Sequence, residues 1–233
     1  MLPSCDIVTE YEIAMQSAER RVFDLLHSLE WQLHSEKKNG SIWMMRCNVT
    51  DHNMYRYEGR ICNRSPAEVA AMIHPQGLHR GKWDSQSAGT SLVQTVDTET
   101  SVILHETKAR MMGLISARET VDLCRFSTDA SDGTRTVVMV SVNHEKAPLR
   151  QGIVRAYTHP TLLLISPLGA SDTKITSILH ADLHVYGIPT TIVESLMPKG
   201  VQQFFDDLVK YASKEDNKVS LQHNLAGWIT QTI

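Results

Sequence analysis

The sequence lacks the signals of secretion, membrane insertion and lipid anchoring. Its 233 residues contain no run of about 18 apolar residues, and the start "MLPSCDIVTEYE" has neither a basic segment nor an apolar core. It has no Met-Gly start and no C-terminal cysteine box. We therefore expect a cytoplasmic protein with no transmembrane helix.

Cysteine pairs and a strong net charge are also missing. The four cysteines (Cys5, Cys47, Cys62 and Cys124) are far apart and show no C-x-x-C spacing, which predicts reduced thiols. A formal net charge of −3 leaves no electrostatic footprint for nucleic acid. We expect neither a nucleic-acid partner nor a cofactor.

The familiar catalytic motifs are absent. There is no G-x-S-x-G, no G-x-G-x-x-G and no phosphate-binding loop. "HADLH" resembles a metal site, but on a strand His180 and His184 would be about 13 Å apart, too far to share one ion. We expect no metal there and a solvated strand face instead.

The hydrophobic periodicity divides the chain into helical and strand-forming parts. Helical spacing covers 8–29 and 189–213, and a third helix starts after Ser65 and ends before Pro75. A hairpin turns at Asn39-Gly40, and short β-rich runs fill 90–186. Strands and helices segregate rather than alternate, which predicts one α+β domain with a curved antiparallel sheet.

The run "KITSILHADLHVY" (174–186) is the most informative predicted strand. Period-two alternation gives it an apolar face of Ile175, Leu179, Ala181, Leu183 and Val185. An apolar stripe on the last helix could cover that face, formed by Ile192, Leu196, Phe204 and Leu208. The helix packs directly on the sheet, or it leaves ligand space between; periodicity alone favours direct packing.

The segment 142–152, "VNHEKAPLRQG", connects two strands. It places His144, Lys146 and Arg150 around the small apolar tip Ala147-Pro148-Leu149. Cations beside an apolar tip suit an anionic membrane surface, and an ordinary loop is the alternative.

Six phrases in order resemble the START family of lipid-transfer domains. They are "KWDSQ" (82–86), "LISARETVDL" (114–123), "DGT" (132–134), "GIVRAYTHPTLLLISPL" (152–168), "HADLHVYGIP" (180–189) and "MPKGVQQFFDDL" (197–208). The resemblance covers residues 8–212, leaves 213–233 as an unassigned tail, and is strongest to the small single-domain branch that binds cholesterol or bile acids. It implies a helix-grip fold, a curved antiparallel sheet around a long C-terminal helix with one lipid in the tunnel between them.

The resemblance also assigns roles to individual residues. Trp83, Arg118, Glu119 and Arg155 would be structural, with Arg118 and Glu119 pinning a loop to the sheet. The loop 142–152 and the last helix would gate the tunnel and touch membranes, through His144, Lys146, Leu149, Arg150, Ile192 and Leu196. Ala117 and Thr120 depart from the usual proline and aromatic of the family.

An acid–arginine pair inside the tunnel of some family members aligns here with His105 and Cys124. That pair is therefore absent, unless a one-residue slip brings in Glu106; we expect His105 to face inward. The polar ligand-binding candidates are His105, Thr107 and Cys124. The apolar candidates are Met111, Met112, Leu179, Leu183, Phe204 and Leu208.

The sequence thus predicts a non-enzymatic, monomeric carrier of one sterol-like lipid (cholesterol, an oxysterol or a bile acid) between membranes. One alternative is a lipid sensor that acts on a protein partner, for example through residues 213–233. Another is a helix-grip enzyme of the aromatase or cyclase type, in which His105 is the acid or base to test.

Overall fold

The computed structural model describes residues 5–109, 115–185, 187 and 189–214. The elements follow in the order α1 (Cys5–His27), β1 (Gln32–Lys37), β2 (Gly40–Cys47), β3 (His52–Ile61), α2 (Pro66–Ile73), α3 (Arg80–Trp83), β4 (Ser87–Thr95), β5 (Thr100–Thr107), β6 (Arg118–Thr128), β7 (Arg135–Ser141), β8 (Val154–Arg155), β9 (Tyr157–Thr158), β10 (Thr161–Leu168), β11 (Asp172–Leu179), β12 (Ala181–Asp182) and α4 (Thr190–Ala212). The predicted segregation of strands and helices is confirmed.

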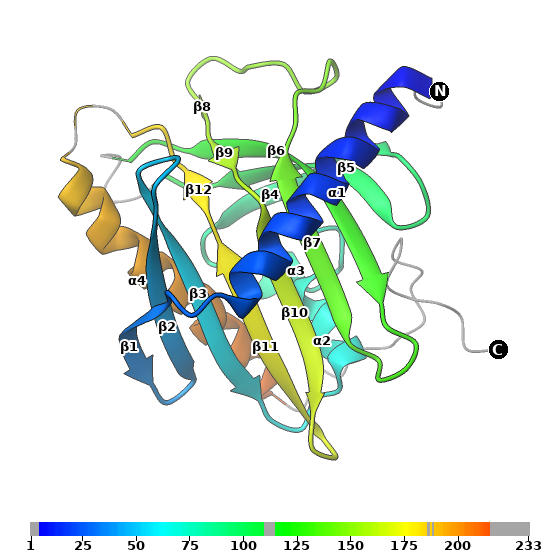
Figure 1. Cartoon of the computed structure of the whole chain (residues 1–233), viewed down its shortest axis with the longest axis vertical. Coiled ribbons are helices and arrows are strands. Elements are labelled where there is room, and N and C mark those ends of the chain that lie inside the picture. Colours follow the sequence, from blue (N-terminus) through cyan, green and yellow to red (C-terminus); the bar gives the residue numbers. More distant parts are fainter. Residues whose placement is uncertain (1–4, 110–114, 186, 188, 215–233) are drawn as a thin grey trace.

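One large sheet organises the molecule (Figure 1). Its strands lie in the order β1-β2-β3-β11-β10-β7-β6-β5-β4, and each neighbouring pair is antiparallel. The short strand β8 adds to β6 in parallel, and β9 pairs with β12 in a separate two-stranded sheet. The sheet thus joins the N-terminal hairpin to the last strands before α4.

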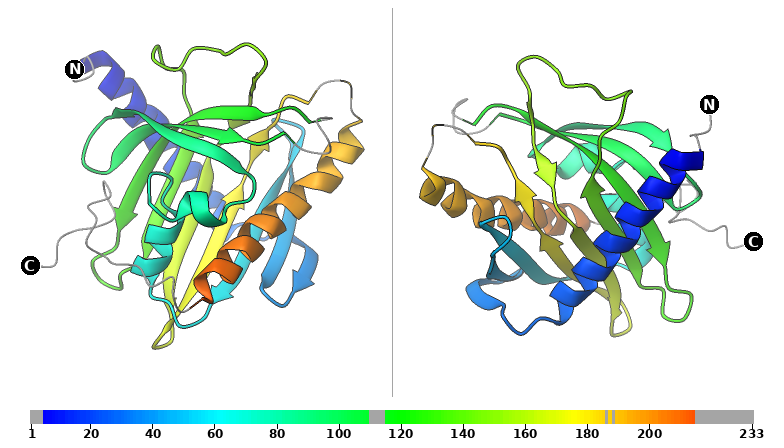
Figure 2. Two further views of the ribbon diagram at one scale, coloured as in Figure 1. Left: turned by 180° about the vertical axis from the view of Figure 1, so that it is seen from behind. Right: turned by 45° about the horizontal axis from the view of Figure 1, so that its top comes forward.

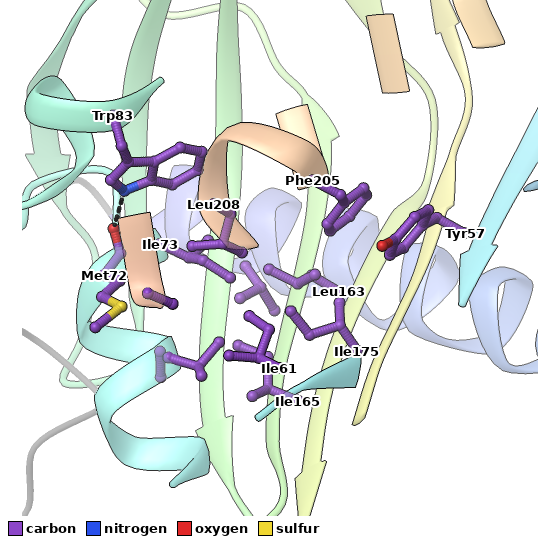
Figure 3. Close-up of a cluster of buried hydrophobic side chains, with 14 of the residues drawn as sticks. Tyr57, Ile61, Met72, Ile73, Trp83, Leu163, Ile165, Ile175, Phe205 and Leu208 are labelled. Carbon is purple, nitrogen blue, oxygen red and sulfur yellow. Dashed lines mark hydrogen bonds between the residues drawn. The ribbon is translucent and has the colours of Figure 1, made fainter. Parts of the chain in front are cut away.

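Helices cover both faces of this sheet. Helix α1 crosses one face, whereas α4 lies across the opposite face with α2 and α3 beside it (Figures 1 and 2). We call the face under α1 the outer face and the face under α4 the inner face. Met15 and Val22 of α1 are fully buried against outer-face residues such as Leu123 and Leu162. Phe205 and Leu208 of α4 pack with Leu163 and Ile175 on the inner face (Figure 3). The C-terminal helix on the inner face is the arrangement that the resemblance predicts.

Strand alternation decides which side chains reach the inner face. In β6, Val121 and Leu123 pack on the α1 side, while Cys124 and Phe126 belong to the inner cluster. Each successive side chain of a strand points to the opposite face, so every second residue of β6 points toward α4.

Local sequence signals set the ends of several elements. Ser65 caps α2 with a complete capping box, in which Ser65 and Glu68 satisfy each other's backbone N–H groups. The capping prediction and the β1–β2 hairpin are confirmed. The turn itself lies at Lys38 and Asn39, one residue before the predicted Asn39-Gly40, because Gly40 already pairs with Lys37 as the first residue of β2.

Two predicted strands are each broken in two. The run 174–186 leaves the large sheet after Leu179, and β12 then pairs with β9 rather than with β3. His180 at the break is only 5% exposed, lies 2.9 Å from Thr50 Oγ1 through Nε2, and stacks on His159. The expected solvated face is therefore wrong for His180. The run 152–157 likewise splits into β8 and β9.

No helix within the described ranges is long and apolar enough to cross a membrane.

Candidate functional site

A cavity of about 850 Å³ lies between the inner face of the sheet and α4. Much of its wall is apolar, with side chains that include Phe126, Met139, Leu163, Leu179, Leu183 and Phe204. Periodicity alone favours direct packing of the last helix on the sheet. That prediction is wrong between Leu196 and Phe205 of α4, where the helix lines the cavity. The helix and the sheet leave room for a ligand.

The C-terminal half of α4 is the fixed roof of the cavity. Phe205 stacks on Tyr57 of β3 with ring centroids 3.8 Å apart, and Leu208 is fully buried. The backbone carbonyl of Ala212 accepts a hydrogen bond from Arg64 Nε at 2.9 Å. In the first half, Ile192 is 41% exposed and Leu196 lines the cavity. The C-terminal half of the helix is thus held by packing, and the first half is tied to the sheet at Glu194, which pairs with Arg46 of β2 and whose carbonyl accepts a hydrogen bond from Tyr55 Oη at 3.4 Å.

Most of the ligand-binding residues predicted within the described ranges line this cavity. His105, Thr107, Leu179, Leu183 and Phe204 all do so. Their contact with a ligand stays a prediction. Met111 and Met112 lie outside the described residues.

Two predicted wall residues lie elsewhere. Cys124 and Leu208 are fully buried in the inner hydrophobic cluster and are not part of the cavity wall. Cys124 points inward as parity requires, but its Sγ lies 4.0 Å from His105 Nε2, so that the imidazole stands between it and the cavity. Burial raises the pKa of the Cys124 thiol, which keeps it protonated.

The cavity wall holds an acid that the sequence reasoning overlooked. Asp122 accepts hydrogen bonds from Thr120 Oγ1 at 2.6 Å and from Ser141 Oγ at 2.7 Å. His105 Nε2 lies 3.9 Å from its Oδ2. Burial lowers the pKa of His105 despite the attraction of Asp122, which keeps the imidazole neutral. Asp122 and Cys124 are two residues apart on β6, so their side chains point to the same face. The sequence "VDLC" (121–124) could therefore have placed Asp122 on the inner face together with Cys124.

An ion pair in the wall comes from Arg80 of α3 and from Asp84, the residue that follows this helix. Arg80 Nε donates to Asp84 Oδ2 at 2.7 Å, and Arg80 Nη1 donates to the carbonyl of Ile73 at 3.0 Å. Asp84 Oδ1 accepts from the backbone N–H groups of Gln86 and Ser87. An acid and an arginine therefore line the tunnel after all, at positions other than those aligned from the family.

His105 is consequently one of several titratable groups at the wall. Asp84, Glu106 and Asp122 line the same cavity. His105 and Glu106, the two residues between which the alignment left a choice, both line the cavity, but they have different partners. His105 lies near Asp122, whereas Glu106 accepts a hydrogen bond from Arg150 at 2.6 Å.

The residues predicted to be structural form ties between loops and sheet. Glu119 is fully buried and accepts hydrogen bonds from Arg150 Nε at 2.6 Å and from Arg155 Nη2 at 2.6 Å. Arg118 Nε donates to the carbonyl of Leu183 at 3.2 Å, and the indole of Trp83 donates to the carbonyl of Met72 at 2.9 Å (Figure 3).

The predicted gate loop is held at Ala147 and Pro148 of its apolar tip, where Ala147 is buried, and it exposes the side chains of Lys146 and Leu149. Arg155 Nη2 donates to the carbonyls of Ala147 and Pro148, and His144 Nε2 lies 2.9 Å from Gln94 Oε1. Lys146 is exposed, and Leu149 is 76% exposed. Arg150 forms ion pairs with Glu106 and Glu119, so it is not a free cation for membrane contact as predicted.

In the described part of the chain, no three His, Cys, Asp or Glu side chains are grouped so that they could hold a metal ion.

Comparisons with known proteins agree with this architecture. The START domain family model matches residues 24–217. The StAR-related lipid transfer protein 5 of Mus musculus is 32% identical over 166 residues, which cover 70% of this chain and 76% of the relative. The human StAR-related lipid transfer protein 5 is 32% identical over 161 residues, 68% of this chain and 74% of the relative.

Solved structures show the same fold. Human StAR-related lipid transfer protein 5 superimposes with a TM-score of 0.83 at 26% identity, covering 90% of this chain and 99% of that one. Human STARD10 has a TM-score of 0.70 at 18% identity and covers 91% of this chain and 82% of its own. With its sheet, its roof helix and the match over 24–217, this chain belongs to the START domain family.

Proposed function

We propose that the protein binds and transfers one sterol-like lipid, such as cholesterol, an oxysterol or a bile acid. The observation that carries this proposal is the cavity of about 850 Å³ under α4. Burying roughly 300 Å² of apolar ligand surface contributes on the order of 7 kcal/mol before the costs of association. The relatives named as lipid transfer proteins support it.

Exchange of the lipid needs the roof to move away from the sheet. In the first half of α4 Ile192 is exposed, and the loop 142–152 adjoins the cavity through the Arg150–Glu106 pair. We place the opening between these two segments, with Lys146 and Leu149 touching an anionic membrane. The carrier acts as a monomer in the cytoplasm.

The carrier function needs no turnover. Asp122 is engaged by two hydroxyl groups and Asp84 by Arg80, so both carboxylates have structural partners already. The His105–Asp122 approach of 3.9 Å is the feature that would favour an enzyme instead. Incubation with a bound sterol followed by mass analysis decides between them: the carrier returns the lipid unchanged, and a modified lipid contradicts this reading.

The first experiment is native mass spectrometry with lipid extraction, on protein purified from eukaryotic cells. The expected result is one sterol or bile acid at near one-to-one stoichiometry. Fluorescent sterol uptake serves as the second readout. A protein that carries no lipid and takes up no sterol would overturn the proposal.

A further inference from the structure

One buried arginine in the cavity wall has no acidic partner in the described part of the chain. Arg118 lines the cavity and is only 6% exposed. Its Nε donates to the carbonyl oxygen of Leu183 at 3.2 Å. Its Nη1 donates to the hydroxyl oxygen of Ser116 at 2.9 Å and also to the carbonyl oxygen of that residue. All of these acceptors are neutral, so they do not balance the positive charge of Arg118.

Two other arginines have the partner that Arg118 lacks. Arg64, the other buried arginine among the described residues, has its Nη1 3.3 Å from the carboxylate of Glu68. Arg80, which also lines the cavity, pairs with Asp84. Burial lowers the pKa of Arg118, but a guanidinium stays protonated in a protein. A buried cation without a counter-charge is unfavourable, and an anion that enters the cavity would relieve it.

Strand alternation turns Arg118 toward the ligand space. It stands an even number of residues before Asp122 and Phe126 on β6, and all three line the cavity. The Nε and Nη1 groups of Arg118 donate to the protein, whereas Nη2 makes no hydrogen bond with a described residue. Because an arginine donates but never accepts, Nη2 is available to a ligand oxygen.

Two lysines add positive charge where the cavity meets solvent. Lys108 and Lys199 are exposed, and both line the cavity. Gln86 joins their segments, because its carbonyl accepts from the backbone N–H of Lys108 at 3.0 Å and its Nε2 donates to the carbonyl of Gly200 at 2.8 Å. The residue before Lys108 pairs with Arg118 across β5 and β6. An acidic lipid that enters here meets positive charge at the mouth and again at Arg118.

The acids of the cavity wall do not supply the missing charge. Asp84 and Glu106 are paired with arginines of their own. Asp122 is engaged by two hydroxyl groups and lies four residues along β6 from Arg118, about 13 Å at about 3.3 Å per residue. Asp122 disfavours a carboxylate deeper in the cavity, since like charges repel. The anionic end of a ligand therefore belongs at Arg118.

We propose that Arg118 binds the anionic end of the carried lipid, a carboxylate or a sulfate, so that the cavity prefers an acidic steroid to a neutral one of the same nucleus. This inference rests on the proposed function and narrows it, because a neutral sterol leaves the charge of Arg118 unbalanced. It adds a ligand contact to the loop-pinning role that the resemblance gives this residue.

The test compares three steroids of one nucleus in competition with a fluorescent sterol. Their side chains end in a carboxylate, in the corresponding primary amide and in the corresponding alcohol. We expect the carboxylate to bind about tenfold more tightly than the other two at neutral pH, because hydrogen bonds between charged groups are the strong ones. Equal affinities would overturn this inference and leave the carrier function standing. No binding by any of the three, or by the fluorescent sterol, would overturn both.

Variants assign the preference to Arg118. Arg118→Gln should reduce the affinity ratio of carboxylate to amide below about twofold, whereas Arg118→Lys keeps the charge and should keep most of the preference. Because the ratio compares two ligands on one protein, a general loss of stability affects both alike. Arg60→Gln is the matched control, since Arg60 pairs with Asp172 at an exposed position outside the cavity. An unchanged ratio in Arg118→Gln would overturn the inference.

Salt separates Arg118 from the two lysines and uses the unaltered protein, so this comparison holds even if a variant fails to fold. Salt screens exposed charges far more than buried ones, so the preference should persist at about 1 M sodium chloride. A preference lost at high salt would place the anion at Lys108 and Lys199 and overturn the assignment. Inorganic phosphate at matched ionic strength should displace the carboxylate steroid no more than chloride does; selective displacement would indicate a site for free anions and would also overturn it.

Discussion

At the residue scale, one buried carboxylate ties three segments together. Glu119 on β6 pairs with Arg150 of the gate loop and with Arg155 of β8, and its side chain is fully buried. Although burial raises its pKa, the hydrogen bonds from Arg155 and Arg150 lower the pKa below its usual value. Glu119 is therefore ionised in the folded protein, and its charge holds Arg150 and Arg155 in place.

We predict that Glu119→Gln lowers the free energy of unfolding by about 3 kcal/mol, because it leaves two arginines beside an uncharged group. Glu106→Gln is the matched control. Glu106 is 27% exposed and shares Arg150 with Glu119, so its loss should cost less than about 1 kcal/mol. Urea denaturation measures both, and equal losses would contradict the assignment.

His180 gives the fold a pH dependence of known sign. Burial, with help from His159, lowers the pKa of His180 from 6.5 to about 4. Because the unfolded chain binds the proton more readily, stability is complete above pH 6.5 and declines as the pH falls to about 4. This lowering of the pKa of His180 corresponds to a loss of about 3 kcal/mol of stability at low pH.

We predict that His180→Gln flattens this decline, since the amide keeps a hydrogen-bonding group near Thr50 but does not titrate. Denaturation midpoints at pH 7.5, 6, 5 and about 4 measure the slope. His34→Gln, at an exposed position, should leave the slope as it is. An unchanged slope in His180→Gln would place the effect on other groups.

Residue-level prediction succeeded where strand parity applies. Alternation places His105 and Leu179 on the inner face, and both line the cavity. Leu183 also lines it, but it follows β12, beyond the point where the predicted strand breaks. Parity does not say how deep a side chain lies, which is why Cys124 is buried behind His105. Arg80 and Asp84 lie on and just after a four-residue helix, which is too short to show a period, so no pattern in the sequence could place them at the wall.

At the element scale, the sequence predicts the order of elements well and the breaks in them poorly. Long periodic runs such as α1 and α4 end within a few residues of the expected positions. The break at His180 depends on β9, distant in sequence, which takes β12 away from the large sheet. Such a competition between pairing partners is a tertiary effect that the local pattern does not contain.

One glycine governs how α4 is anchored. A Cβ on Gly59 would lie 2.6 Å from the carbonyl oxygen of Asn39 and against the ring of Tyr57. Tyr57 Oη donates to that same carbonyl at 2.6 Å, and its ring stacks on Phe205. The absence of a side chain at position 59 therefore allows the contact that holds the roof helix.

We predict that Gly59→Ala lowers the free energy of unfolding by about 2 kcal/mol and speeds sterol release, because Tyr57 must move away from Phe205. Gly81→Ala is the control, since no atom lies within 4 Å of a Cβ there. Thermal unfolding and the dissociation rate of a fluorescent sterol are the two readouts. Normal stability and release in Gly59→Ala would show that the Tyr57–Phe205 contact is not the anchor.

At the scale of the whole molecule, the two faces of the sheet differ: the outer face is packed, and the inner face encloses the cavity. Helix α1 covers the outer face with a cluster of buried side chains. The inner face has a packed cluster at the C-terminal half of α4 and a cavity beside it. We propose that a lipid enters by movement of the gate loop and of the first half of α4, while the rest of the molecule stays folded.

We propose that the gate loop joins this movement to the membrane. Its tip exposes Lys146 and Leu149, whereas Arg150 is held by Glu106 and Glu119. Near an anionic surface each cation contributes about 1 kcal/mol, so reversing one charge costs about 2 kcal/mol in membrane attraction. We predict that Lys146→Glu slows sterol transfer to anionic vesicles by about thirtyfold at low salt and leaves equilibrium sterol binding unchanged.

The control is Lys38→Glu, which makes the same charge change at an exposed turn of the β1–β2 hairpin. Transfer between donor and acceptor vesicles is followed by fluorescence at low and high ionic strength. Because salt screens exposed charges, the difference between Lys146→Glu and the unaltered protein should shrink at high salt. If Lys38→Glu slows transfer as much as Lys146→Glu does, net charge rather than the gate loop steers the protein to the membrane.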